Sequence, residues 1–176
     1  MPSNKSISVS RKKIGVPDNQ QERLKTIGWI TGYVDGEGCF SVSFIRNATT
    51  KSGWQIFPEF VVTQGGKSKE SLEILQHFFG CGKIFVNRRF DNHREHIYRY
   101  CVRSQDELRE RIIPFFEENL LRTAKKEDFN HFSFILNQMS RKRHLTKRGM
   151  QMIAKRVEKM NHKKASRFLE SSETTC

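Results

Sequence analysis

The sequence has no hydrophobic run long enough to cross a lipid bilayer. Its longest uncharged, apolar-leaning stretch extends from Thr26 to Val34, which is far short of the roughly 20 residues that a membrane-spanning helix requires. No apolar signal region follows the N-terminus. We therefore expect a soluble protein that is not secreted and has no membrane partner.

Cysteine pairs of the CxxC type are also missing. The four cysteines, Cys39, Cys81, Cys101 and Cys176, are scattered singly along the chain, which favours reduced thiols over zinc ligands or a disulfide framework. This pattern predicts an intracellular protein, either in a bacterial or archaeal cytoplasm or in an organelle such as a chloroplast or mitochondrion.

Acidic residues are scarce beside basic ones. The 176 residues include 32 Lys and Arg against 19 Asp and Glu, which gives a formal net charge of +13. Such an excess repels itself unless a polyanion is bound, so nucleic acid is the expected class of partner.

Patterned sequence lies between residues 21 and 160, enough for a single domain. Residues 1–20 are serine-rich and basic, and residues 161–176 have no periodicity, so we expect a flexible N-terminal arm and a flexible C-terminal tail. A plain tail is the first interpretation of the arm, and a DNA contact or an organellar targeting segment stays open as an alternative.

Hydrophobic spacing within this domain alternates between the helical and the strand period. The order of elements is α-β-β-α-β-β followed by helices, which predicts an α+β fold with an antiparallel sheet covered by helices on one face. No internal repeat is visible. The predicted elements are a helix over Leu24–Asp35, a hairpin over Phe40–Phe44 and Trp54–Thr63, a helix over Ser68–Phe79 opened by Ser68, a second hairpin over Lys83–Phe90 and His96–Arg103 with its tip at Asp91–Glu95, and helices over Gln105–Glu118, Lys125–Ser140 and Thr146–Met160.

Three glycines, Gly28, Gly32 and Gly36, fall four residues apart on the first predicted helix. This spacing places them on one stripe of bare backbone, at a cost of up to about 1 kcal/mol each relative to alanine. The functional interpretation is close packing against another helix. The alternative is chance composition together with a glycine that ends the helix.

Two acids, Asp35 and Glu37, stand at the C-terminal end of the same helix. The helix dipole disfavours a carboxylate there by a few tenths of a kcal/mol or more. If two copies of the helix met along the glycines, the paired acids would attract a divalent cation, and oxygen ligands beside phosphate favour Mg2+.

Three segments of the sequence resemble those of a known protein family. Ile30–Gly38, reading ITGYVDGEG, is similar to the signature of the LAGLIDADG homing endonucleases. The VTQ at Val62–Gln64 and the KKEDF at Lys125–Phe129 lie where members of the family have comparable segments, and the resemblance extends from about Leu24 to Met160. It implies the αββαββα homing endonuclease fold, whose saddle-like four-stranded sheet lies in the major groove of DNA.

The resemblance also implies an assembly and an active site. A single motif without a repeat implies a homodimer on a long, nearly palindromic DNA site, with Gly28, Gly32, Gly36 and Asp35 at the interface. Carried over by position, Glu37 is the metal-binding acid, assisted by the Gly36 carbonyl, and Asp35 is a structural hydrogen-bond acceptor. Gln64 orders water near the metal, and a lysine lies near the attacking water, with Lys125 the better match and Lys126 the alternative.

Side chains opposite the apolar set of each strand are the candidates for contact with DNA, because arginine, glutamine and asparagine can read base edges. A solvated sheet face is the alternative. The candidates on the sheet are Ser41, Ser43, Gln55, Glu59, Lys83, Asn87, Arg89, Arg99 and Arg103, and those at turns and edges, suited to phosphate, include Arg46 and Arg88.

The function that follows is site-specific cleavage of double-stranded DNA by Mg2+-dependent phosphodiester hydrolysis, leaving 5′-phosphates and short 3′ overhangs. One alternative is a maturase that binds intron RNA. The other is a catalytically inactive DNA-binding regulator, against which the presence of Glu37 argues.

Overall fold

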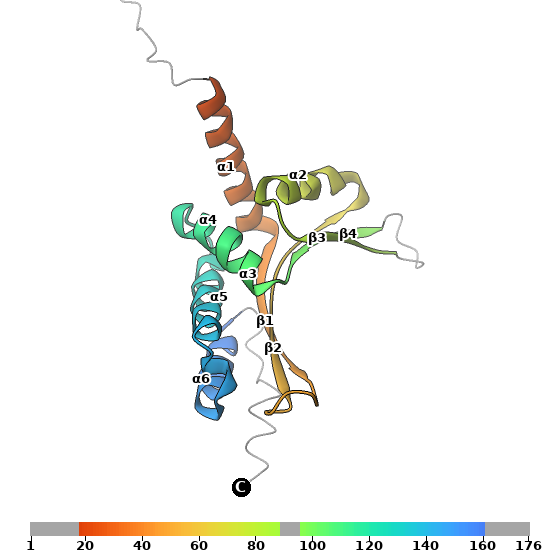
Figure 1. Ribbon diagram of the computed structural model, residues 1–176. Helices are drawn as coiled ribbons and strands as arrows, with labels where there is room; N and C mark the ends of the chain where they lie inside the picture. The colour runs from red at the N-terminus through yellow and green to blue at the C-terminus, as the bar shows by residue number, and fades with distance from the viewer. Residues whose placement is uncertain (1–17, 89–95, 161–176) are drawn as a thin grey trace, which may run out of the picture.

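A four-stranded antiparallel sheet organises the computed structural model, which describes residues 18–88 and 96–160. Its strands lie in the order β1-β2-β4-β3, and helices cover one face while the other stays open (Figure 1). This confirms the predicted α+β fold. The strands are β1 (Gly38–Arg46), β2 (Trp54–Gly65), β3 (Lys83–Asn87) and β4 (Ile97–Val102); the helices are α1 (Asp18–Glu37), α2 (Lys69–Phe79), α3 (Gln105–Glu107), α4 (Ile113–Glu118), α5 (Lys125–Ser140) and α6 (Lys147–Val157), with short 3-10 turns η1 (Gly66–Ser68) and η3 (Arg143–Leu145).

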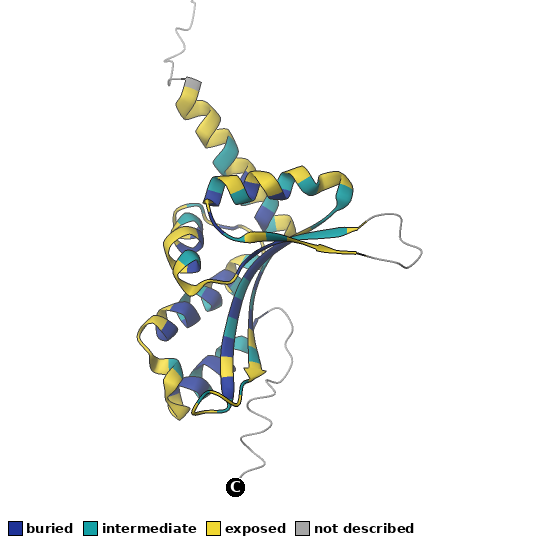
Figure 2. Ribbon diagram, turned by 45° about the vertical axis from the view of Figure 1, so that its right-hand side comes forward, coloured by how far each residue is buried: buried dark blue, intermediate teal, exposed yellow. Residues whose placement is uncertain are grey.

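Alternating side chains of the strands build the core between the sheet and the helices. Phe40 on β1 stacks on Phe60 of β2 at 5.1 Å between ring centroids, and it meets Phe116 of α4 edge-on at 5.5 Å. All three are fully buried, and much of the length of the central strands is buried (Figure 2). Aromatic packing of this kind dominates core energetics, so it orients the sheet and leaves the odd-numbered side chains of β1 and β2 on the opposite face.

Helix α1 is buried only near its C-terminal end. Ile30 and Val34 are fully buried, whereas Leu24 is 58% exposed and Trp29 is 41% exposed. The N-terminal half of α1 stands away from the rest of the molecule (Figures 1 and 2). The helix therefore anchors its final turns beside the sheet and presents the remainder to the surroundings.

Several predicted boundaries shift. Helix α1 is longer than Leu24–Asp35, α6 ends earlier than Met160, and Ser68 makes no side-chain capping hydrogen bond. The predicted helix Gln105–Glu118 is interrupted by a π-helical segment, η2 (Leu108–Ile112), because Pro114 at the start of α4 has no N–H to continue the regular ladder. The predicted hairpin tip Asp91–Glu95, the arm before residue 18 and the tail after residue 160 lie outside the described residues.

Candidate active site and nucleic-acid interface

Helix α1 passes directly into strand β1 at Gly38, and this junction positions the candidate acids. A Cβ atom at Gly38 would lie 2.5 Å from Val34 Cγ1 and 2.8 Å from Val34 O, so no side chain fits there without a shift. Glu37 therefore ends α1 as an exposed carboxylate, directly after the exposed Gly36.

Asp35 ties the end of α1 to the loop between α4 and α5. Its carboxylate accepts hydrogen bonds from the backbone N–H of Arg122 (2.9 Å), the backbone N–H of Thr123 (3.1 Å) and the Thr123 hydroxyl (2.6 Å). Burial alone would raise the pKa of Asp35, but these hydrogen bonds and the charge of Lys125 outweigh it and hold that pKa below its ordinary value. Asp35 thus serves as a hydrogen-bond acceptor within the chain.

Lys125, the first residue of α5, reaches the same junction. Its ammonium donates to the carbonyl oxygen of Gly38 and to that of Gly36 at 3.4 Å. The neighbouring Lys126 is exposed, and within the described part of the chain its side chain forms no hydrogen bond with the junction. The structure therefore brings Lys125, and not Lys126, beside Gly36 and Glu37.

Gln64 approaches from strand β2 through Tyr33, a residue that the sequence did not single out. The Tyr33 hydroxyl lies 2.6 Å from Ser71 Oγ. Burial and, more weakly, the negative charge of Glu37 raise the pKa of Tyr33, while hydrogen bonding to Ser71 and Gln64 opposes them. Tyr33 stands one turn before Glu37 on α1, and this i, i+4 spacing was the signal that could have identified it.

The oxygen atoms at this junction suit a hard divalent cation. Glu37 offers a carboxylate and Gly36 a backbone carbonyl, the ligand types that Mg2+ and Ca2+ select. Within the described ranges, no three His, Cys, Asp or Glu side chains group together to hold a metal.

The glycine stripe of α1 faces away from the core. A Cβ atom added at Gly28, Gly32 or Gly36 would meet nothing within 4 Å. Space for close helix packing is thus present along the whole stripe, and it is not filled by the described part of this chain.

The open face of the sheet carries the polar residues predicted to contact DNA. It also carries apolar residues that were not among those predictions. Val61 and Cys101 are buried on this face, while Phe57 is half-buried and Phe85 is exposed. The polar candidates on this face are Ser41 and Ser43 on β1, Gln55 and Glu59 on β2, Lys83 and Asn87 on β3, Arg99 on β4 and Arg103 just after it; Arg89 lies outside the described residues.

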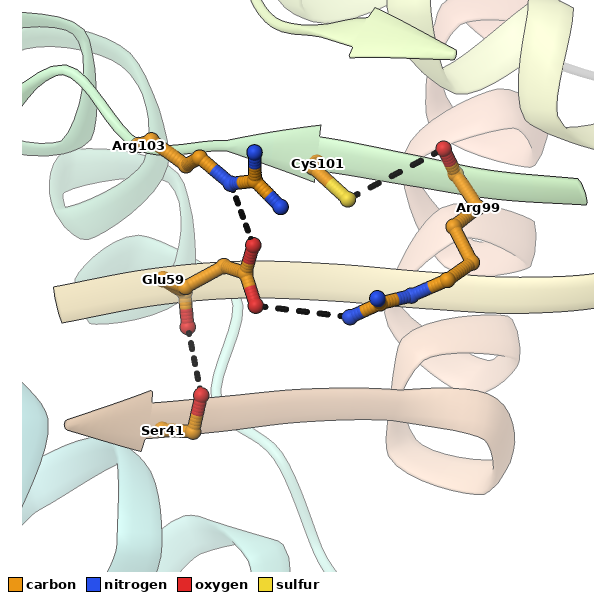
Figure 3. Close-up of polar contacts among 5 residues, drawn as sticks. All are labelled: Ser41, Glu59, Arg99, Cys101 and Arg103. Atoms are coloured by element: carbon orange, nitrogen blue, oxygen red, sulfur yellow. Dashed lines mark hydrogen bonds and ion pairs between the residues drawn. The ribbon is translucent and has the colours of Figure 1, made fainter. Parts of the chain in front are cut away.

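Glu59 is engaged by two of these arginines (Figure 3). Arg103 Nε donates to Glu59 Oε1 at 2.5 Å, and Arg99 Nη2 donates to Glu59 Oε2 at 3.4 Å. Ser41 Oγ donates to the backbone carbonyl of Glu59 at 3.4 Å. Glu59, Arg99 and Arg103 therefore form one ion-paired group on the open face.

Other predicted DNA contacts differ in their surroundings. Arg46 places its guanidinium 4.1 Å from the ring centre of Trp54, a residue of the helix-covered core, because residue 46 follows the even-numbered side of β1. Gln55 accepts a hydrogen bond from Asn47 at 2.9 Å. Arg88 is exposed just beyond β3. These three stay predictions as DNA contacts.

Within the described ranges, none of the helices combines the length and apolar character that a membrane crossing needs.

The fold and the site share one defining arrangement: a helix that ends in carboxylates lies beside an open antiparallel sheet that carries arginines.

Comparison with known proteins identifies the family. A model of the LAGLIDADG endonucleases matches residues 30–136, more than half of the chain. The chain belongs to the LAGLIDADG endonuclease family.

Individual relatives agree in fold and differ in length. The crystal structure of the homing endonuclease I-TnaI superposes with a TM-score of 0.73 at 37% identity, covering 84% of this chain and 96% of that one. The I-SmaMI LAGLIDADG homing endonuclease bound to cleaved DNA gives 0.76 at 31% identity, covering 85% of this chain but 48% of that one. The probable intron-encoded endonuclease 3 of Neurospora crassa is 31% identical over 140 residues, which are 78% of this chain and 25% of that protein. The first curated relatives are matched over only about a quarter to a third of their own length.

Proposed function

We propose that this chain is a site-specific homing endonuclease that cleaves double-stranded DNA as a homodimer with Mg2+. The observation that carries the proposal is the grouping of Glu37, the Gly36 carbonyl and Lys125 at the end of a helix whose glycine stripe is open. Family membership adds that such a helix end belongs to a nuclease.

The lengths of the relatives support pairing of two copies. This chain corresponds to 96% of the I-TnaI chain but to only 48% of the I-SmaMI chain. If one fold fills the whole of one relative and half of another, two copies of the shorter chain would together match the longer one, as in a twofold assembly. Packing along Gly28, Gly32 and Gly36 would set one Glu37 from each copy side by side.

The chemistry is metal-assisted phosphodiester hydrolysis. Bound Mg2+ supplies a water of lowered pKa and offsets negative charge on the phosphate. Glu37 and the Gly36 carbonyl would hold the ion, and the Lys125 ammonium would stabilise charge that develops on the phosphate oxygens. Gln64 would orient water, and Asp35 would keep the α4–α5 loop, and therefore Lys125, in place. We expect 5′-phosphates and short 3′ overhangs as products.

DNA is the partner that fits the open sheet face. I-SmaMI was solved on cleaved DNA, and this chain carries a formal charge of +13. Arginine and glutamine side chains on a strand surface can read base edges in the major groove. Two copies related by a twofold axis would read a nearly palindromic site.

Glu37→Gln provides the test. The substrate is a supercoiled plasmid carrying the uninterrupted insertion site, made by joining the sequences that flank the coding intron. We expect linearisation in Mg2+ by the natural protein, and binding in Ca2+ without cutting by Glu37→Gln. Glu118→Gln, an equal change of charge at an exposed position of α4, should cut normally. Binding of intron RNA without any DNA cleavage would instead identify a maturase, and loss of DNA binding in Glu37→Gln would assign that residue a structural role.

A further inference from the structure

We propose that Glu59 is a specificity-determining residue that positions Arg99 and Arg103 and withholds them from random DNA. This inference rests on the proposed function, because it concerns how the same sheet face reads its duplex.

The geometry places one carboxylate between two guanidinium groups. Glu59 Oε1 accepts from Arg103 and Glu59 Oε2 accepts from Arg99, at 2.5 and 3.4 Å. The Glu59 side chain is only 13% exposed, whereas Arg99 and Arg103 are 41% and 43% exposed. The acid is thus the enclosed centre of the group, and the arginines form its outer surface.

Strand register explains what the arginines cover. Arg99 pairs with Thr63 and Cys101 pairs with Val61 across β2 and β4, and Cys101 lies between Arg99 and Arg103, whose side chains both point toward Glu59 (Figure 3). Cys101 is 3% exposed, although none of the helices in residues 18–88 and 96–160 covers this face. We attribute this burial to the two arginines, which Glu59 holds down against the sheet.

Aromatic rings complete the arrangement for Arg103. Its guanidinium carbon lies 5.0 Å from the ring centre of Phe85 and 5.7 Å from that of Phe57. Cation–π contacts of this kind favour a guanidinium lying near the rings. Arg103 is therefore held on the open face by two aromatic contacts as well as by the ion pair.

Paired arginines respond differently to random and to cognate DNA. Phosphates attract arginines whatever the sequence, but here they must first displace Glu59, whose own charge repels them. A duplex that offers guanine acceptors to the arginines and a cytosine amino group to Glu59 satisfies all three side chains at once. Glu59 therefore weakens random binding more than cognate binding, which is how a repulsive element creates specificity.

Glu59→Gln tests this on a short random-sequence duplex, with binding measured by fluorescence anisotropy over a series of salt concentrations. Because the two arginines are 41% and 43% exposed, we apply the range for surface ion pairs, about 1.4- to 5-fold for each pair. Release of two arginines should then tighten random binding by roughly 2- to 30-fold. The salt dependence should steepen by up to about 1.8 in log–log slope, for two more phosphate contacts. Glu59→Asp, which keeps the charge, should stay near the natural protein.

Two controls isolate the mechanism. Glu70→Gln removes the same charge from an exposed position on α2, on the helix-covered side of the sheet, and should change random binding far less. In a background in which Arg99 and Arg103 are both glutamine, Glu59→Gln should have no further effect, because the residues that it positions are gone.

Alkylation of Cys101 tests the same group without DNA. Freed arginines should uncover this thiol, so Glu59→Gln should raise its labelling rate several-fold, read by peptide mass spectrometry. Cys81, which contacts the Tyr100 hydroxyl on the helix-covered side, serves as an internal reference. Equal random binding by Glu59→Gln and Glu70→Gln, or unchanged Cys101 labelling, would overturn the inference and leave the nuclease proposal standing. Failure of the plasmid assay with raised Cys101 labelling would overturn the nuclease proposal alone.

Discussion

Gly32→Ala should act in opposite directions on one copy of the chain and on a pair of copies. In a single chain the new Cβ atom meets nothing within 4 Å, and alanine is more favourable than glycine in a helix by about 0.8–1 kcal/mol. Gly32 lies between the fully buried Ile30 and Val34, so this part of α1 unfolds with the core. The free energy of unfolding of the monomer should therefore rise by up to about 1 kcal/mol.

In a dimer packed along the stripe, symmetry places two new methyl groups in the contact. Each overpacked methyl group costs about 1–3 kcal/mol, so the dimer should lose about 2–6 kcal/mol, a rise in Kd of at least roughly 30-fold. Sedimentation over a range of protein concentrations measures Kd, and urea unfolding at low concentration measures the monomer. Thr26→Ala, about 120° away around α1, should stabilise the helix without changing Kd. A Gly32→Ala protein that stays as dimeric as the natural one would refute packing along the glycines, and Gly32→Leu should be monomeric for the same reason.

Three more predictions concern the end of α1. The folded-state pKa of Asp35 is held below 3.8, so the stabilisation that Asp35 contributes is present above that pH and disappears as pH falls through the folded value. The urea midpoint of the natural protein should therefore drop more steeply between about pH 5 and 3 than that of Asp35→Asn. At neutral pH, Asp35→Asn should be about 1 kcal/mol less stable than the natural protein. Gly38→Ala should cost about 1–3 kcal/mol in urea unfolding, because its Cβ would lie 2.8 Å from the backbone oxygen of Val34, whereas Gly36→Ala in the monomer should not destabilise. Lys125→Met should lower single-turnover cleavage by roughly 100- to 1000-fold while Ca2+-supported binding persists; a parallel loss of binding would assign the lysine to DNA contact.

The local hydrophobic periodicity of the sequence was enough to predict most of the fold. The helix predicted over Lys125–Ser140 has those bounds in the structure, and the described strands of both predicted hairpins pair with each other, because alternation and helical spacing depend on neighbouring residues. The π-helical segment at Leu108–Ile112 was missed because hydrophobic spacing does not show how one proline reroutes backbone hydrogen bonds.

In the candidate site too, features that depend on neighbouring residues could be predicted, and features that depend on distant residues could not. Placement of Glu59 on the open face follows from the period-2 pattern of its own strand, and that much the sequence predicted. Its partners Arg99 and Arg103 are 40 and 44 residues away, and pairing them requires the register of β2 with β4. The spacing of Tyr33 from Glu37 could have marked it as a neighbour of the site, but its contact with Ser71, which is 38 residues later, could not be read from that spacing. Partner identity is thus a property of tertiary structure.

The end of α1 also explains why one of its two acids, and not the other, suits a metal. Both carboxylates lie where the helix dipole is unfavourable. Asp35 escapes that penalty because two backbone N–H groups and a hydroxyl occupy its oxygens. Glu37 is exposed, and the nearby Lys125 ammonium is engaged by the backbone carbonyls of Gly36 and Gly38. Under the proposed function, a cation shared with a second copy would offset the charge of Glu37. Mg2+ or Ca2+ should consequently favour the dimer in the natural protein, by linkage, and should leave the self-association of Glu37→Gln nearly unchanged.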